Sequence, residues 1–217
     1  GASLPQETAI AVKAAVLPFA RFRTPEGVVV DSLLSPEMRS TGEVMGLDQH
    51  FDTAFAKAQA GAGSPMPTSG KVFISVANHD KRNVIIYAKM LESLGFEIVS
   101  TGGTAEILRR NGLNSVIVAS KFAEANGDHS IVDMVRNGDI DLILNTPAGG
   151  AARSDGYEIR AAAVSVGCPV MTTISEFAAA VQAINALREH SWDIMSLQEH
   201  GVQLAAAVDA RSEGGEA

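Results

Sequence analysis

The chain has 217 residues, of which 46% are apolar and 19% charged, as in an ordinary soluble globular protein with room for one full domain and part of another. The net charge of −8 argues against nucleic acid as a partner, because phosphate backbones select basic surfaces. No apolar run approaches the roughly 20 residues of a membrane helix, and residues 1–5 do not resemble a signal peptide, so we expect a cytoplasmic protein without a membrane partner. The single cysteine, Cys168, excludes an intrachain disulfide and a cysteine zinc cluster; we interpret it as a small buried apolar residue.

Residues 1–46 contain short apolar stretches, such as 10–12 and 28–30, interrupted by proline and glycine. This pattern predicts strands and irregular connections that belong to a larger domain, because the segment has too little periodic apolar content for its own core. Residues 47–69 are predicted to form a helix, over about 48–60, and a linker. In the helix Phe51, Ala54, Phe55 and Ala58 recur at helical spacing, and glycine and proline then follow.

Residues 70–204 alternate between buried strands and amphipathic helices. Strands are predicted at 72–76, 96–99, 115–118, 142–144 and 169–171. Helices are predicted at 82–94, at 105–110, from Ser130 to 137–138, at 159–166 and at 175–187. Ser130 and Asp133 have the spacing of a capping box at the start of the third helix. The pattern predicts an α/β fold with a parallel five-stranded sheet and helices on both faces. Residues 205–217, rich in Ala, Glu and Gly, are expected to be a disordered tail.

Ligands of open parallel sheets bind beyond the carboxyl ends of the strands. Residues Thr101, Gly102, Gly103 and Thr104 connect the second strand to a helix, where backbone N–H groups can turn toward an oxyanion. The alternative is a tight turn in which Thr104 only caps the helix. Lys81 follows the first strand and Lys121 follows the third, so the two ammonium groups are expected near this turn, and the combination favours a phosphate site.

Asn145 ends the fourth strand, and its amide can both donate to and accept from a base or a ribose. The alternative is a turn residue without a ligand. His79 and Asp80 are a less favoured acid–base pair, because neighbouring residues at a strand end point apart. We predict no catalytic residue and no metal site, since the sequence has no Walker loop, no Gly-x-Gly-x-x-Gly and no histidine cluster with metal spacing.

Two segments resemble the carbamoyl-phosphate synthase large chains. Residues 11–19 and 36–46, the latter reading PEMRSTGEVMG, are similar to the end of the second ATP-grasp domain of that family. Residues 70–200 resemble its C-terminal allosteric domain, which has the methylglyoxal-synthase-like fold. The resemblance implies that 1–46 ends an ATP-grasp carbamoyl-phosphate synthetic domain, with a partial α+β fold, and that 70–204 form the allosteric domain.

The resemblance also implies a regulatory function for the chain, without catalysis of its own. The parent ligase makes carbamoyl phosphate from glutamine-derived ammonia, bicarbonate and ATP, for arginine and pyrimidine biosynthesis. It uses ATP with Mg²⁺ or Mn²⁺, and K⁺ is a further candidate; a glutamine amidotransferase small subunit is its partner, and it is expected to be oligomeric. The effectors that the resemblance implies are UMP, an inhibitor, and IMP, an activator. The phosphate positions fall on Lys81, Thr101, Thr104 and Lys121, together with the glycines between the threonines, and the base or ribose position falls on Asn145.

The chain departs from the family pattern at two positions. Pro147 stands where many relatives have a hydroxyl residue, and Ala14 stands where the family often has an acid that contacts ornithine. Asp155 and Thr172 match other positions of the ornithine pocket and are its candidate remnants, so ornithine is a further candidate effector.

A rival interpretation is a free-standing phosphate lyase similar to methylglyoxal synthase, with Asp128 as an acid. Thr146 stands at that family's second acidic position, which disfavours this activity. A third interpretation is a subunit-contact module without a ligand.

Overall fold

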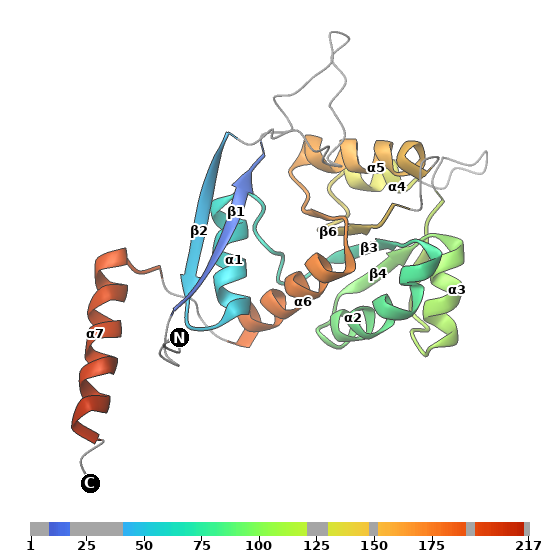
Figure 1. Ribbon diagram of the computed structural model, residues 1–217. Helices are drawn as coiled ribbons and strands as arrows, with labels where there is room; N and C mark the ends of the chain where they lie inside the picture. Colours follow the sequence, from blue (N-terminus) through green and yellow to red (C-terminus); the bar gives the residue numbers. More distant parts are fainter. Residues whose placement is uncertain (1–8, 18–40, 121–129, 148–151, 190–193, 215–217) are drawn as a thin grey trace.

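The computed structural model describes residues 9–17, 41–120, 130–147, 152–189 and 194–214. Its centre is a parallel five-stranded sheet with the strand order β5-β4-β3-β6-β7 (Figure 1). The strands are β3 (Lys71–Ser75), β4 (Glu97–Ser100), β5 (Ile117–Val118), β6 (Leu142–Asn145) and β7 (Val170–Met171). The predicted α/β class is therefore confirmed.

Helices cover both faces of this sheet because successive strand residues point in opposite directions. Val72 and Ile74 of β3 belong to one apolar core, whereas Phe73 between them belongs to the other. The first core is covered by α1 (Phe51–Gly61), α2 (Lys81–Ser93), α3 (Gly102–Arg110) and α6 (Ile174–Glu189). The second core is covered by α4 (Ile131–Arg136) and α5 (Ala152–Val166), on the opposite side of the sheet in Figure 1.

The predicted helices are confirmed, with shifts at their ends. The capping box is present, since the Ser130 hydroxyl accepts a hydrogen bond from the Asp133 N–H at 3.2 Å and the Asp133 carboxylate accepts one from the Ser130 N–H at 3.3 Å. Helix α5 begins at Ala152, about two turns before the predicted start at 159, because the small and polar residues there carry no apolar stripe that would reveal a helix. Residues 28–30 lie outside the described residues.

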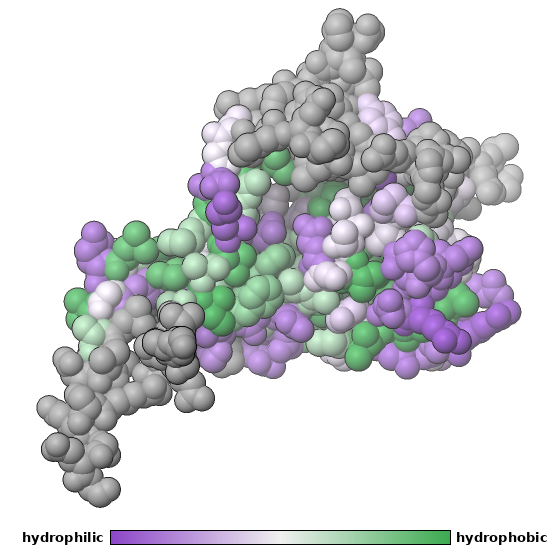
Figure 2. Space-filling view, in the orientation of Figure 1, coloured by the Kyte–Doolittle hydropathy of each residue, from purple (hydrophilic) through white to green (hydrophobic). Residues whose placement is uncertain are grey.

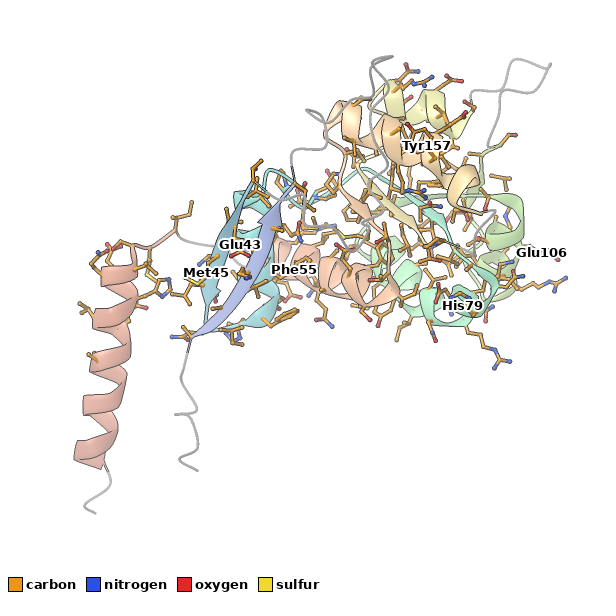
Figure 3. All side chains as sticks on the ribbon, turned by 45° about the horizontal axis from the view of Figure 1, so that its top comes forward. Glu43, Met45, Phe55, His79, Glu106 and Tyr157 are labelled. Atoms are coloured by element: carbon orange, nitrogen blue, oxygen red, sulfur yellow. The ribbon has the colours of Figure 1, made fainter. Side chains whose placement is uncertain are left out.

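A second sheet pairs β1 (Ile10–Val16) with β2 (Gly42–Asp48) in antiparallel register. Helix α1 packs on one face of this sheet and also against α6, and Figure 3 shows Phe55 between them. Phe55 and Met66 belong to the first core of the five-stranded sheet. The helix and linker predicted for residues 47–69 therefore contribute to the core of the neighbouring domain.

The expected disordered tail at 205–217 is wrong for its first ten residues. Helix α7 (Leu197–Gly214) runs through them, and the predicted domain end at 204 falls inside this helix. The run of three alanines at 205–207 explains the helix, because alanine has the highest helix propensity, and the glycines that favour disorder come only at 214–215. In Figure 1, α7 stands away from the five-stranded sheet.

The strand order places a topological switch point beside β3. The connection after β3, through η2 (Asn78–Asp80) and α2, leads to β4 over the first face of the sheet. The connection after the adjacent strand β6, through α5, leads to β7 over the second face. Because the two connections diverge, the carboxyl ends of β3 and β6 border a crevice in which ligands of this architecture bind.

Candidate functional site

The turn at residues 101–104 begins helix α3 beside this switch point. Thr101 is the N-cap residue by its backbone angles, and its side chain makes no capping hydrogen bond. The Thr101 hydroxyl instead lies 3.3 Å from the hydroxyl of Ser75, at the end of β3. The N–H groups of Gly102 and Gly103, at the first two helical positions, have no acceptor within the helix, and both glycines are exposed. The turn can therefore donate to an anion.

Lys81 approaches this turn from the start of α2. Its ammonium nitrogen would lie 3.4 Å from a Cβ atom built on Gly103. Lys81 is half-buried and makes no ion pair among the described residues. Placing an ammonium group beside two free N–H groups creates a site for an oxyanion with at least one full positive charge. Lys121, the second cation of the predicted phosphate site, lies outside the described residues.

Thr104 has an inward-facing hydroxyl. The residue is 2% exposed, and its hydroxyl accepts a long hydrogen bond of 3.5 Å from the Val76 N–H. On the other side of β3 the Thr146 hydroxyl accepts a 2.9 Å hydrogen bond from the Ala77 N–H. The two threonines thus hold the chain after β3 from both sides, which fixes the direction in which η2 and Lys81 leave the sheet.

Asn145 is paired with a buried arginine that the sequence did not reveal. The Arg160 guanidinium, 0% exposed, donates a 2.7 Å hydrogen bond to the Asn145 side-chain oxygen. The side-chain nitrogen of Asn145 donates a 3.4 Å hydrogen bond to the Ser75 carbonyl. A Cβ atom on Gly156 would lie within 2.5 Å of both the guanidinium and the amide oxygen, so any larger residue there would have to displace them. Arg160 precedes a run of alanines, and this pattern does not indicate that the arginine is buried. Ser75 could have been predicted as a site residue, because it is a polar residue at the end of a strand.

His79 and Asp80 are in contact, contrary to the expectation that they point apart. The His79 Nε2 atom lies 3.3 Å from an Asp80 carboxylate oxygen, because both residues belong to the short helix η2 rather than to a strand. The His79 side chain is 75% exposed, on the outer rim of the fold.

The other candidates are only partly placed. Thr172 follows β7, and its N–H donates a 3.2 Å hydrogen bond to the Glu176 carboxylate. Burial raises the pKa of Glu176, and this hydrogen bond opposes the rise. Asp155 lies in α5, but its side chain is outside the described residues, as is Asp128 of the rival interpretation. Among the described residues no group of three or more metal-binding side chains is found, and no helix is long and apolar enough to cross a membrane.

Comparisons with known proteins agree with this architecture. A protein-family profile described as an MGS-like domain matches residues 83–172. A carbamoyl phosphate synthase large chain from Kocuria rhizophila is 67% identical over 202 residues, which cover 92% of this chain and 18% of the relative. Proteins of the same name from Paenarthrobacter aurescens and Streptomyces griseus are 62% and 52% identical, over 97% and 96% of this chain and 19% of each relative.

This chain belongs to the carbamoyl phosphate synthase large-chain family. It spans about a fifth of the length of the relatives it matches. The MGS-like match covers strands β4 to β7 of the five-stranded sheet, whose fold is that of an MGS-like domain. The short antiparallel sheet of β1 and β2 fits the end of an ATP-grasp domain, the region of large chains that residues 1–46 resemble.

Proposed function

We propose that this chain is the regulatory region of a carbamoyl phosphate synthase large chain and binds a nucleoside monophosphate, UMP or IMP, at the carboxyl edge of its five-stranded sheet. The observation that carries the proposal is the ammonium group of Lys81 beside Gly103 at the N-terminus of α3. A phosphate dianion at this position would gain the lysine charge, two backbone donors and the partial positive charge of the helix end.

The distance from this turn to Asn145 suits a ligand that has a phosphate group at one end and a base at the other. Thr101 follows β4 and Asn145 ends β6, and these strands flank β3 on either side. Since neighbouring strands are about 4.8 Å apart, the two residues are separated by roughly 10 Å across the sheet edge. Ser75 lies between them, in contact with both. A phosphate at the turn would therefore leave the sugar and base over Ser75 and Asn145.

The rest of the proposal concerns the longer protein. We propose that it is a cytoplasmic ligase that makes carbamoyl phosphate for arginine and pyrimidine biosynthesis, and that this region regulates it without catalysing a step. ATP, Mg²⁺ or Mn²⁺, a glutamine amidotransferase subunit and oligomer contacts would belong to the parts outside this chain. Ornithine is a further candidate effector, through Asp155 and Thr172.

An exposed methionine on the second sheet supports the assignment to a larger protein. Met45 of β2 is 53% exposed and points away from α1, toward the side of α7 in Figure 3. Figure 2 shows apolar residues gathered over this part of the molecule. A two-stranded sheet is marginal by itself, so its outer face is expected to be covered in the full large chain.

Calorimetric titration with UMP, IMP, ornithine and ribose 5-phosphate tests the proposal. A charge-assisted hydrogen bond contributes about 1.5–3 kcal/mol, so Lys81→Ala should weaken binding of every phosphorylated ligand about 10- to 100-fold. Lys89→Ala is the matched control, because Lys89 is exposed on the same helix, and it should leave affinity unchanged.

Two results would contradict the proposal. Equal affinities for the Lys81→Ala variant and the wild type would remove Lys81 from the site. Formation of methylglyoxal from dihydroxyacetone phosphate would instead support the lyase alternative. That family has an acidic residue at the position of Thr146, whose hydroxyl here accepts a hydrogen bond from the Ala77 N–H group.

A further inference from the structure

Arg160 is the largest of the fully buried side chains among the described residues, and its guanidinium contacts the Asn145 amide at the candidate effector site. Burying a guanidinium is costly unless it is hydrogen-bonded, and the Asn145 side-chain oxygen is one of its acceptors. The backbone around it is adapted to the contact, since Gly156 leaves the space that the guanidinium and the Asn145 oxygen occupy.

The contact fixes the direction of the Asn145 amide. A guanidinium carries only donors, so the atom that faces Arg160 at 2.7 Å has to be the amide oxygen. The amide nitrogen consequently points the other way, toward Ser75 and the switch-point crevice. Its hydrogen bond to the Ser75 carbonyl, at 3.4 Å, is at the long limit and uses one of its two N–H groups. Asn145 therefore presents a donor, and not an acceptor, at the crevice.

We infer that Arg160 is a positioning residue that makes Asn145 a donor, so that the site selects a base with an oxo group over one with an amino group at the same position. The inference rests on the proposed function, because it assumes that the base lies over Asn145. An oxo group accepts the amide hydrogen bond, whereas an amino group would place two donors against each other. The mismatch leaves both groups unsatisfied in a site where Asn145 is only 7% exposed.

The pair UMP and CMP tests the selection, because uracil and cytosine have an oxo and an amino group, respectively, at position 4. IMP and AMP provide the same contrast in purines. By calorimetry, the wild type should bind the oxo member of each pair about 10- to 100-fold more tightly. Ribose 5-phosphate has no base, so it measures the phosphate and sugar contacts without the contribution of the base.

Three variants separate a positioning role from a structural one. Asn145→Asp keeps an oxygen for Arg160 but replaces the donor by an acceptor, so the preference should reverse toward CMP and AMP. Arg160→Met removes the donor that holds the amide oxygen and leaves only the long 3.4 Å hydrogen bond to the Ser75 carbonyl to orient the amide, so the ratio of the CMP and UMP dissociation constants should fall by about threefold or more. Arg160→Lys retains a donor for the amide oxygen and should keep the preference. Ribose 5-phosphate should bind all three folded variants, and thermal melting checks folding.

The outcomes distinguish this inference from the proposed function. Equal binding of UMP and CMP by the wild type, together with binding of ribose 5-phosphate, overturns the inference and leaves the phosphate site intact. Absence of binding of UMP, IMP and ribose 5-phosphate overturns the proposed function itself, and the inference with it. Should Arg160→Met be unfolded, Asn145→Asp decides: an unchanged preference for the oxo base overturns the inference, and a reversed one supports it.

Discussion

Gly46 of β2 is the position where one added methyl group should have the largest effect on stability. A Cβ atom there would lie 2.0 Å from the Ala54 carbonyl oxygen and 2.5 Å from the Ala58 nitrogen, both in the backbone of α1. Ordinary contact begins at 3.4 Å, so Gly46→Ala would force α1 away from the sheet by more than about 1 Å. Helix α1 also carries Phe55, which is 8% exposed, so this movement would open the core shared with α6.

Overpacking of this kind typically costs about 1–3 kcal/mol, and the upper end applies because neither partner is a side chain that could rotate away. For a protein of this size, about 3 kcal/mol corresponds to a Tm lower by roughly 6–12 °C. Differential scanning calorimetry or denaturant unfolding measures the change. Gly42→Ala is the matched control, since Gly42 lies in the same strand with nothing within 4 Å of an added Cβ atom. If both variants melt together, the close approach of α1 to β2 does not exist in solution.

Three further predictions concern single side chains. Ser130→Ala should lower the free energy of unfolding by about 1 kcal/mol, because the capping box of α4 is lost, whereas Ser165→Ala, on the exposed side of α5, should change it by less than about 0.5 kcal/mol. Burial raises the pKa of the Cys168 thiol from 9.0 to about 12, so alkylation at pH 8 should be roughly 1000-fold slower in the native protein than in urea, and equal rates would contradict this. Burial also raises the pKa of Glu176, so the folded state binds its proton more tightly than the unfolded state; the carboxyl group's contribution to stability is full below the unfolded pKa and is lost as the pH rises through the folded pKa. Glu176→Gln should therefore flatten the loss of stability above about pH 4.5, and an unchanged pH profile by denaturant unfolding would count against it.

Much of the fold could be predicted from local patterns. Continuous β-branched strands between amphipathic helices indicated a parallel sheet covered on both faces, since backbone periodicity and burial are properties of short segments. The capping box at Ser130 was visible for the same reason. The disorder expected at 205–217 was wrong because this segment combines alanines, which favour a helix, with terminal glycines, which do not. The alanines lie within α7, and the glycines come only at its end.

The candidate site was predictable only in part. Strand ends can be recognised in a sequence, so the turn at 101–104, Lys81 and Asn145 could be chosen as polar groups at one edge, and the structure places Lys81 beside that turn. The bond between Arg160 and Asn145 could not be predicted, because it joins residues of two elements whose faces meet only after α5 has packed on the sheet.

The sequence by itself determined the order of strands and helices, the family and the residues that carry charge at the sheet edge. Only the tertiary structure decided the direction of the Asn145 amide, the inward turn of the Thr104 hydroxyl and the role of α1 as a bridge between two sheets. The physical reason is range: periodicity and capping act within a few residues, whereas hydrogen-bond direction and close packing depend on atoms that the folded chain brings together from distant positions.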